Sequence, residues 1–216
     1  MSFLAQIFSS KQTPDQAQSA TFLEQLAQRR TIYRIGKNVT QQPQALDQTI
    51  REAVRLSPSA FNSQSSRVVN LFGQAHQDFW DMVKEKLRQI VPAENFHATS
   101  DKIDSFAAGF ATVLFFEDQN VVKGLQEQFA AYADNFPIWS EHSTAIAQFA
   151  VWMALSEQGL GASLQHYNPI VDEQVAERFG IPVYWKLRAQ LVFGSVEAAA
   201  GEKDFIADDT RFKSFY

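Results

Sequence analysis

Cysteine is absent from the 216 residues of this sequence. Its absence excludes disulfides, thiolate catalysis, cysteine-ligated zinc, iron–sulfur clusters and covalently attached haem. Histidine is scarce as well, and its 4 copies show no metal-ligand spacing, so we expect no metal site. A phosphate loop and a Gly-x-Ser-x-Gly nucleophile elbow are also missing. No set of side chains that would carry out catalysis unaided is recognisable.

Long apolar runs and long basic runs are missing too. The most apolar segment, residues 145–155, is interrupted by Gln148 and is too short to span a bilayer. Residues 1–10 lack the basic region and the apolar length of a signal peptide. The formal net charge of −5 argues against nucleic acid and anionic membranes as partners. We therefore expect a cytoplasmic protein.

Phenylalanine is the residue type in excess, with 19 copies that can fill a core, an interface or a ring-binding pocket. The hydrophobic share of 45% is ordinary for a globular protein. The length fits one domain over residues 1–216, or one protomer of an intertwined dimer. We expect residues 1–20 to form a helical arm or a loose extension.

Hydrophobic periodicity and turn residues predict an α+β chain, because strands and long helices do not alternate strictly. The capping box Thr21-Phe22-Leu23-Glu24 begins a helix that runs towards Arg29. The other predicted helices cover residues 43–56, 79–90, 121–132, 140–158 and 171–179. The predicted strands cover residues 67–72, 111–116, 162–167 and 187–196.

The helix predicted over residues 140–158 is apolar on all sides. Ile146, Phe149 and Met153 form one stripe, while Val151 and Leu155 make the other side apolar as well. A helix that is apolar all round is buried. In a chain of this length we expect it to be buried between two protomers.

A polar loop, Ser57-Pro58-Ser59-Ala60-Phe61-Asn62-Ser63-Gln64, follows the helix predicted over residues 43–56. Ser59, Asn62 and Gln64 offer donors and acceptors on short stems, which suits the close approach of a flat polar-edged ligand. The upstream pair Arg29-Arg30 suits a phosphate, because Arg binds phosphate oxygens in a planar fork. A flat heterocycle with one phosphate describes FMN. The alternatives are that the arginines complement a helix dipole and that the loop residues only form a turn.

The segment Gly159-Leu160-Gly161 is not a dinucleotide fingerprint, because it follows a helix and lacks the third glycine. Gly161 either allows backbone to approach a planar ligand or ends the helix. His166 lies near the end of a predicted strand, where a structural role is the alternative to a functional one.

Five blocks of this sequence, taken in order, resemble the nitroreductase family of FMN-dependent oxidoreductases, and within it the fatty-acid-repression nitroreductase-like subgroup. The blocks extend from about Phe22 to Lys203, which is most of the chain. They are Arg29-Arg30-Thr31-Ile32-Tyr33, the polar loop, Asn135-Phe136-Pro137-Ile138-Trp139-Ser140-Glu141, the segment from Gly159 to Pro169, and Trp185-Lys186-Leu187-Arg188-Ala189-Gln190.

The resemblance implies an α+β fold with a central antiparallel or mixed sheet flanked by helices, assembled as an intertwined homodimer with two FMN sites at its interface. It implies the following cofactor contacts. The phosphate and ribityl chain would be held by Arg29, Arg30 and Thr31, with Lys203 as a second phosphate contact; Asn62 and Gln64 would reach the flavin from the partner subunit; and the backbone of Gln165, His166 and Tyr167 would lie against the flavin ring and offer an N–H to its N5.

Tyr33 stands where many family members have Lys or Arg beside the flavin N1–C2 edge. Reduced flavin carries negative charge there, which a nearby cation or donor stabilises. Tyr33 can only donate a hydrogen bond, and Arg34 follows it. Four aromatic residues lie in the region that lines the substrate pocket in relatives, with core packing as the alternative. They are Phe129, Tyr132, Phe136 and Trp139.

The resemblance thus implies a ping-pong oxidoreductase in which NADH or NADPH reduces the bound FMN and a nitroaromatic or a quinone then takes the electrons. Two alternatives stay open. One is a regulatory or stress-response flavoprotein that binds FMN with little turnover. The other is an interaction module without flavin, in which the arginine pair only complements a helix dipole.

Overall fold

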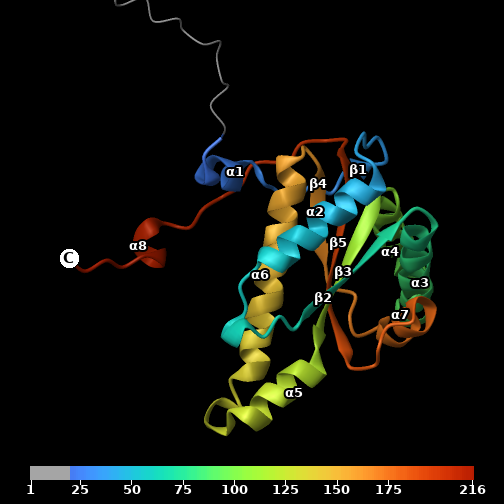
Figure 1. Ribbon diagram of the computed structural model, residues 1–216. Coiled ribbons are helices and arrows are strands. Elements are labelled where there is room, and N and C mark those ends of the chain that lie inside the picture. The colour runs from blue at the N-terminus through green and yellow to red at the C-terminus, as the bar shows by residue number, and fades with distance from the viewer. Residues whose placement is uncertain (1–19) are drawn as a thin grey trace, which may run out of the picture.

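The computed structural model describes residues 20–216 and has an α+β fold around an antiparallel sheet (Figure 1). Its strands are β1 (Ile35–Gly36), β2 (Ser66–Phe72), β3 (Ala111–Asp118), β4 (Gly161–Gln165) and β5 (Trp185–Val196). The order is β1-β5-β3-β2, and β4 also pairs with β5. Strand β5 pairs with β3 and with β4, and its C-terminal residues Ser195 and Val196 pair with β1. The long strand β5 therefore organises the sheet.

Helices cover both faces of this sheet (Figure 1). The main helices are α1 (Phe22–Gln28), α2 (Pro43–Leu56), α3 (Gln74–Ile90), α4 (Phe96–Ala107), α5 (Gln119–Gln128), α6 (Phe136–Glu157), α7 (Asp172–Phe179) and α8 (Asp208–Arg211). Short 3-10 turns are η1 (Ala60–Asn62), η2 (Ala93–Asn95) and η3 (Ala130–Tyr132). In Figure 1, α2 and α6 lie on one face, and α3, α4 and α7 lie on the other.

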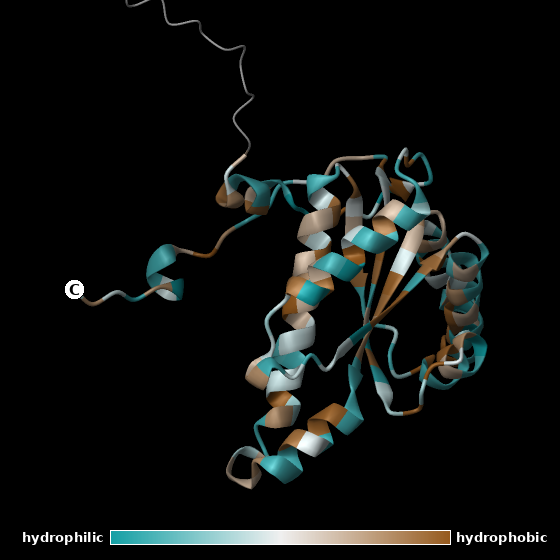
Figure 2. Cartoon of the chain, in the orientation of Figure 1, coloured by the Kyte–Doolittle hydropathy of each residue, from teal (hydrophilic) through white to brown (hydrophobic). Residues whose placement is uncertain are grey.

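The two faces carry two hydrophobic clusters. Phe79, Trp80 and Phe106 belong to the cluster under α3 and α4, whereas Ile50 and Val151 belong to the cluster under α2 and α6. All eight residues of β3 are buried because both of its faces are covered. Figure 2 shows the strands at the centre in brown, while the flanking helices mix teal and brown. A sheet covered on both faces explains the continuous apolar sequence of β3.

Most predicted elements are confirmed, with shifted ends. The Thr21–Glu24 capping box begins α1, and Gly180, with φ of 63°, ends α7 in the left-handed region. The helix predicted over residues 121–132 instead ends at Gln128, because Phe129 leaves helical geometry before η3 begins. The helix predicted over residues 140–158 begins earlier, at Phe136. The arm or extension predicted over residues 1–20 falls on residues that lie, except for Ala20, outside the described part.

Helices α4 and α8 and strand β1 were not predicted, α8 being a single turn of four residues. Helix α4 is rich in Ser, Thr and Asp, and only Phe96, Ile103 and Phe106 are buried, so its apolar periodicity is weak. Strand β1 has two residues, too few for any alternation to show. Among residues 20–216, no helix is both long enough and apolar enough to cross a membrane.

One face of α6 lies against the sheet and α2, and its buried residues include Ser143, Ala147 and Val151. On its other side Ile146 is 41% exposed and Phe149 is 39% exposed. The helix is therefore apolar beyond the face that one chain covers. Burial of that second side between two protomers stays a prediction.

Candidate functional site

A cavity of about 450 Å³ lies between the segment that follows α1 and the segment that follows β5. It is lined by Arg29, Arg30, Thr31, Tyr33, Arg34 and residues 198–203. Five residues predicted to bind the cofactor thus meet at one place, namely Arg29, Arg30, Thr31, Tyr33 and Lys203. The volume falls within the roughly 300–1,000 Å³ range of ligand sites.

Backbone contacts explain how these distant segments meet. Thr31 forms a parallel bridge with Ala162, and the Ile32 N–H donates to the Ala162 carbonyl at 3.0 Å, so the chain after α1 runs beside β4. The Arg30 guanidinium donates through Nη2 to the Gly201 carbonyl at 2.8 Å, across 171 residues of sequence. This bond holds the segment with Lys203 against the cavity.

Arg29 is the most constrained cation at the cavity. Its guanidinium carbon lies 4.6 Å from the centre of the Trp152 ring. Its Nε is buried and has no hydrogen-bond partner within the described part of the chain. Burial, and then the neighbouring charge of Arg30, lower the pKa of Arg29. A partly buried cation with an unpaired N–H beside a second cation is an environment that favours an anion.

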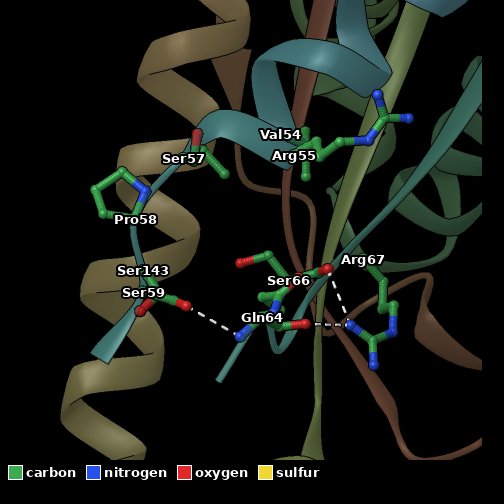
Figure 3. Close-up of a pocket in the computed structure, with 10 residues that line it drawn as sticks. Val54, Arg55, Ser57, Pro58, Ser59, Gln64, Ser66, Arg67 and Ser143 are labelled. Atoms are coloured by element: carbon green, nitrogen blue, oxygen red, sulfur yellow. Dashed lines mark hydrogen bonds between the residues drawn. The ribbon is translucent and has the colours of Figure 1, made fainter. Parts of the chain in front are cut away.

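The polar loop lies at a second cavity, of about 230 Å³ (Figure 3). Ser59 and Gln64 line it, together with Arg67 of β2 and Ser143 of α6. The Ser59 Oγ accepts a hydrogen bond from the Gln64 backbone N–H at 2.9 Å. The side chain of Gln64 is exposed, as is that of Asn62, and neither makes a side-chain hydrogen bond within residues 20–216. Both amides are therefore available to a ligand.

The loop has an unusual backbone. Phe61, Asn62 and Gln64 have φ values of 56°, 48° and 48°, in the left-handed region that side chains disfavour. Residues held in this region cost about 1–3 kcal/mol each and persist only where the surroundings enforce them. A loop with three such residues needs strong external contacts.

The two cavities share no lining residue. In Figure 1, α1 lies beside one end of α6, whereas η1 lies well along α6 towards its other end. Within one chain, therefore, Asn62 and Gln64 are not brought together with Arg29 and Arg30. Contact of the polar loop with the cofactor of a partner subunit stays a prediction.

The segment Gln165–Tyr167 lies at the end of β4. The Tyr167 N–H already donates to the Gln190 Oε1 at 2.7 Å, which leaves His166, exposed just after the strand, as the residue whose N–H can serve a ligand. The Tyr167 ring packs instead against Trp80 and Phe106. Gly161 allows close packing, since a Cβ there would lie 2.9 Å from the Ile32 side chain. Gly159, with φ of 78°, makes the turn after α6.

The four residues predicted to line the substrate pocket form one aromatic cluster with Phe61. The Phe61 ring lies 5.0 Å from Phe129, 5.3 Å from Phe136, 5.9 Å from Trp139 and 6.3 Å from Tyr132, between ring centres. Phe136 is 3% exposed, but Phe61 and Tyr132 are 52% and 48% exposed. The cluster thus packs on the protein from one side and presents aromatic rings on the other.

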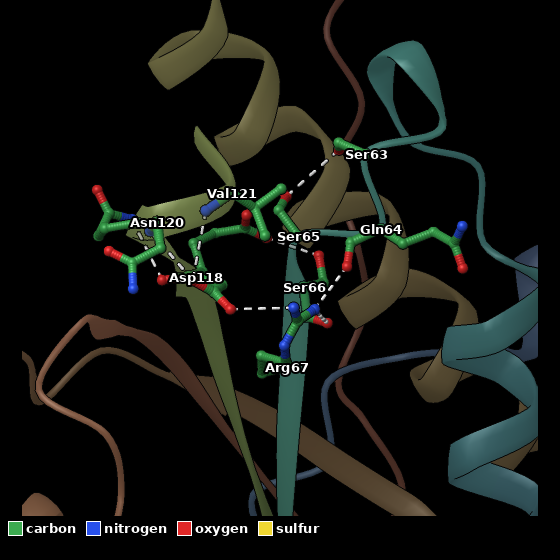
Figure 4. A network of polar contacts seen from close by, with 10 residues as sticks. Ser63, Gln64, Ser65, Ser66, Arg67, Asp118, Asn120 and Val121 are labelled. Carbon is green, nitrogen blue, oxygen red and sulfur yellow. Dashed lines mark hydrogen bonds and ion pairs between the residues drawn. The ribbon is translucent and has the colours of Figure 1, made fainter. Parts of the chain in front are cut away.

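A polar network joins the same loop to α5 (Figure 4). Arg67 donates through Nη1 to the Gln64 carbonyl at 2.5 Å and pairs through Nη2 with the Asp118 Oδ2 at 3.0 Å. The Asp118 Oδ1 accepts from the Asn120 N–H at 3.0 Å and so caps α5. Next to it, Glu117 is fully buried and accepts from the Ser66 hydroxyl at 2.6 Å, and burial raises its pKa.

Three residues beyond the predicted set contribute to these sites. Arg34 lines the larger cavity, Trp152 stacks on Arg29, and Phe61 completes the aromatic cluster. The Arg29-Arg30-x-x-x-Arg34 spacing and an aromatic residue within a polar loop were the available signals. Among residues 20–216, no group of three or more His, Asp and Glu side chains could hold a metal ion.

Comparison with known proteins identifies relatives over most of the chain. The profile described as "Nitroreductase family" matches residues 26–195. The yeast protein HBN1, from Saccharomyces cerevisiae, is 37% identical over 195 residues, which is 88% of this chain and 95% of HBN1. The nitroreductase FRM2 of the same yeast is 33% identical over 190 residues, 87% of this chain and 94% of FRM2.

Solved structures agree. The nitroreductase CinD from Lactococcus lactis, in complex with 4-nitrophenol, superposes with a TM-score of 0.83 and is 53% identical, covering 91% of this chain and all of CinD (100%). Its complexes with chloramphenicol and with nicotinic acid give TM-scores of 0.84 and 0.80.

Proposed function

This chain belongs to the nitroreductase family, and we propose that it is an FMN-dependent oxidoreductase that oxidises NADH or NADPH and reduces nitroaromatics or quinones. The observation that carries the proposal is the convergence of Arg29, Arg30 and Lys203 on one cavity, where a buried Arg29 N–H lacks a partner within the described part of the chain. A single phosphate group would satisfy that N–H and neutralise adjacent cations that otherwise repel each other. The residues present therefore fit FMN.

The proposed enzyme is a homodimer. The polar loop and the phosphate cavity lie apart within one chain, so a complete FMN site would combine the arginines of one protomer with Asn62 and Gln64 of the other. The apolar side of α6 is uncovered in one chain. The segment after residue 200 leads away from the sheet in Figure 1, and its Phe212 and Phe215 are 60% and 93% exposed. A second copy of the chain would cover these surfaces.

When bound, FMN would supply the redox chemistry, taking a hydride from the nicotinamide and passing electrons to the acceptor in a ping-pong sequence. The chain's own residues would bind the cofactor and orient it. Arg29, Arg30, Thr31 and Lys203 would hold the phosphate end, and the His166 N–H would donate to the flavin ring at the end of β4. No side chain has to act as a nucleophile.

Arg34 offers the cation that Tyr33 does not. Tyr33 and Arg34 line the same cavity as the arginine pair, and Tyr33 is 60% exposed. A guanidinium placed there would favour the negative charge of the reduced cofactor. A cation at the flavin N1–C2 edge would favour a turning-over enzyme over a flavoprotein with a regulatory or stress-response role.

Aromatic rings favour a flat aromatic acceptor. The cluster of Phe61, Phe129, Tyr132, Phe136 and Trp139 exposes ring surface against which a nitroaromatic or a quinone can stack. CinD, 53% identical to this chain, has been solved with 4-nitrophenol, and a further CinD structure contains nicotinic acid. We extend that ligand class to this chain as part of the proposal.

An anaerobic visible spectrum of the purified protein tests the function directly. We expect a flavin spectrum that NADH or NADPH bleaches and that a quinone or 4-nitrophenol restores. A bleached flavin that every acceptor reoxidises slowly would favour the regulatory alternative. A colourless protein that cannot be reconstituted with FMN would contradict the proposal.

The Trp152–Arg29 stack predicts a phosphate-specific defect. Replacing Trp152 with leucine removes the ring that lies 4.6 Å from the guanidinium and should leave Arg29 less well oriented. A cation–π contact of this kind contributes about 0.5–2 kcal/mol, so we expect FMN affinity to fall by roughly 2- to 30-fold. Riboflavin, which lacks the phosphate, should bind the variant and the wild type equally well. Fluorescence titration of the apoprotein with both flavins measures the difference, and equal losses for both would contradict this role of Trp152.

A further inference from the structure

The polar loop that carries Asn62 and Gln64 does not hold its shape by itself. Its three left-handed residues are Phe61, Asn62 and Gln64, and its internal hydrogen bonds are a few short-range contacts around Ser59 and Ala60. A backbone of this kind relaxes unless other parts of the protein restrain it. The question is which parts restrain it.

The first restraint is apolar. The Phe61 ring packs against rings from three successive segments: Phe129 at the end of α5, Tyr132 in η3, and Phe136 and Trp139 in the first turns of α6. With Trp139 the rings are nearly parallel, at 18°. Because Phe61 precedes Asn62 directly, these ring contacts restrain the backbone that carries the Asn62 side chain.

The second restraint is polar and leads to the same part of the protein. Arg67 holds the Gln64 carbonyl and pairs with Asp118, the residue that caps α5 (Figure 4). Both restraints therefore connect the loop to the α5–η3–α6 region, which is where the proposed acceptor pocket lies. A shift of the aromatic cluster has to move the loop as well.

We propose that Phe61 is a positioning residue that couples the acceptor pocket to flavin binding, by holding Asn62 and Gln64 in place through its contacts with the aromatic cluster. The proposal rests on the proposed function, since it needs a bound FMN and an aromatic acceptor. In it, the aromatic cluster has two roles, as the wall against which the acceptor stacks and as the support of the loop that contacts flavin. Coupling between the two ligands is then reciprocal.

A double-mutant cycle on the full-length homodimer tests the coupling. The variants are Phe61→Leu, Trp139→Leu and the double variant, with Phe61→Tyr as a matched control that keeps the ring. The dissociation constant of FMN is measured by fluorescence titration of each apoprotein. We expect Phe61→Leu to weaken FMN binding about 10-fold, Trp139→Leu to weaken it several-fold, and the double variant to be no weaker than Phe61→Leu. Phe61→Tyr should bind FMN as the wild type does.

A second measurement asks whether the acceptor senses Phe61. FMN release is followed with and without saturating 4-nitrophenol. We expect 4-nitrophenol to slow FMN release in the wild type and in Phe61→Tyr. In Phe61→Leu, the logarithm of the ratio of the release rates without and with 4-nitrophenol should be less than half of its wild-type value. This readout does not depend on turnover, and it compares proteins that are all folded and loaded with flavin.

The outcomes separate the two proposals. Multiplicative effects in the cycle, or an equal response to 4-nitrophenol in all variants, would overturn the role of Phe61 while leaving the oxidoreductase intact. A wild-type protein that does not bind FMN would overturn the proposed function itself. If Phe61→Leu does not fold, Phe61→Trp replaces it in the cycle, because the larger ring disturbs the packing of the aromatic cluster. An unchanged FMN affinity of Phe61→Trp would also contradict the coupling.

Discussion

Replacing both Arg29 and Arg30 with glutamate is expected to abolish FMN retention, with at least a roughly 1,000-fold loss of affinity. Each charge-assisted hydrogen bond to a phosphate contributes about 1.5–3 kcal/mol, so the loss of two costs about 3–6 kcal/mol, and repulsion between the phosphate and the two new carboxylates adds to this cost. Arg29 is the more sensitive position because its buried Nε has no other partner in the described chain. Replacing Arg30 also breaks its hydrogen bond to the Gly201 carbonyl, and so frees the segment that carries Lys203.

Flavin content after purification and titration of the apoprotein measure this loss. The matched control is Lys102→Glu with Lys123→Glu, which changes the net charge equally at two exposed positions on α4 and α5. Circular dichroism confirms that both double variants are folded. Unchanged flavin content in the arginine variant would mean that the pair only complements the dipole of α1, and it would remove the main argument for an FMN site.

How far a sequence predicts such a fold depends on how local each signal is. Strand β3 was predictable because a strand that is buried on both faces has a continuous apolar sequence. Helix α7 was predictable because Val175 lies on its buried face and the left-handed Gly180 ends it. Helix α4 was not predictable, because it is stabilised by packing of Ile103 and Phe106 in the cluster shared with α3 and the sheet, and by little in its own composition.

The same distinction applies to the candidate site. Arg29 and Arg30 are adjacent in sequence, so their shared role could be predicted before the structure. The segment with Lys203 lines their cavity and is joined to Arg30 by the hydrogen bond to Gly201, which spans 171 residues and has no local signal in the sequence. Phe61 is harder still, because an aromatic residue in a polar loop can point into solvent or into a cluster. Only the positions of α5 and α6 decide between these.

His76 gives rise to the second large effect, on stability. It is 1% exposed on α3, where its Nδ1 lies 2.8 Å from the Thr112 hydroxyl and its Nε2 lies 3.2 Å from the Ala107 carbonyl. Thr112 also accepts a hydrogen bond from the Trp80 Nε1 at 2.9 Å. A neutral imidazole fits these partners, with Nε2–H donating to Ala107 and Nδ1 accepting from Thr112. Burial, with a smaller contribution from the charge of Lys37, lowers the pKa of His76 from 6.5 to about 4.

We expect His76 to cost the fold about 3 kcal/mol as the pH falls from 6.5 to about 4. Over this interval the unfolded chain binds a proton at His76 and the folded chain does not, so the free energy of unfolding falls by about 1.4 kcal/mol per pH unit. Above pH 6.5 the imidazole is neutral in both states, and below about 4 it is charged in both, so the contribution is constant outside the interval. Urea unfolding of the apoprotein at fixed concentration, repeated from pH 7 to pH 4, measures the slope.

The comparison that isolates His76 is with His76→Asn, whose side-chain oxygen can still accept from Thr112 but cannot be protonated in this range. Carboxylates contribute the same slope to both proteins, so the difference between the two curves reports the one histidine. His142→Asn, which removes an exposed histidine of α6, controls for the loss of a histidine elsewhere. A difference curve that stays flat between pH 6.5 and pH 4 would show that the folded protein accommodates a charged His76, and the lowered pKa would then be wrong. A slope of about one proton would instead establish His76 as a buried neutral group whose protonation limits the acid stability of the fold.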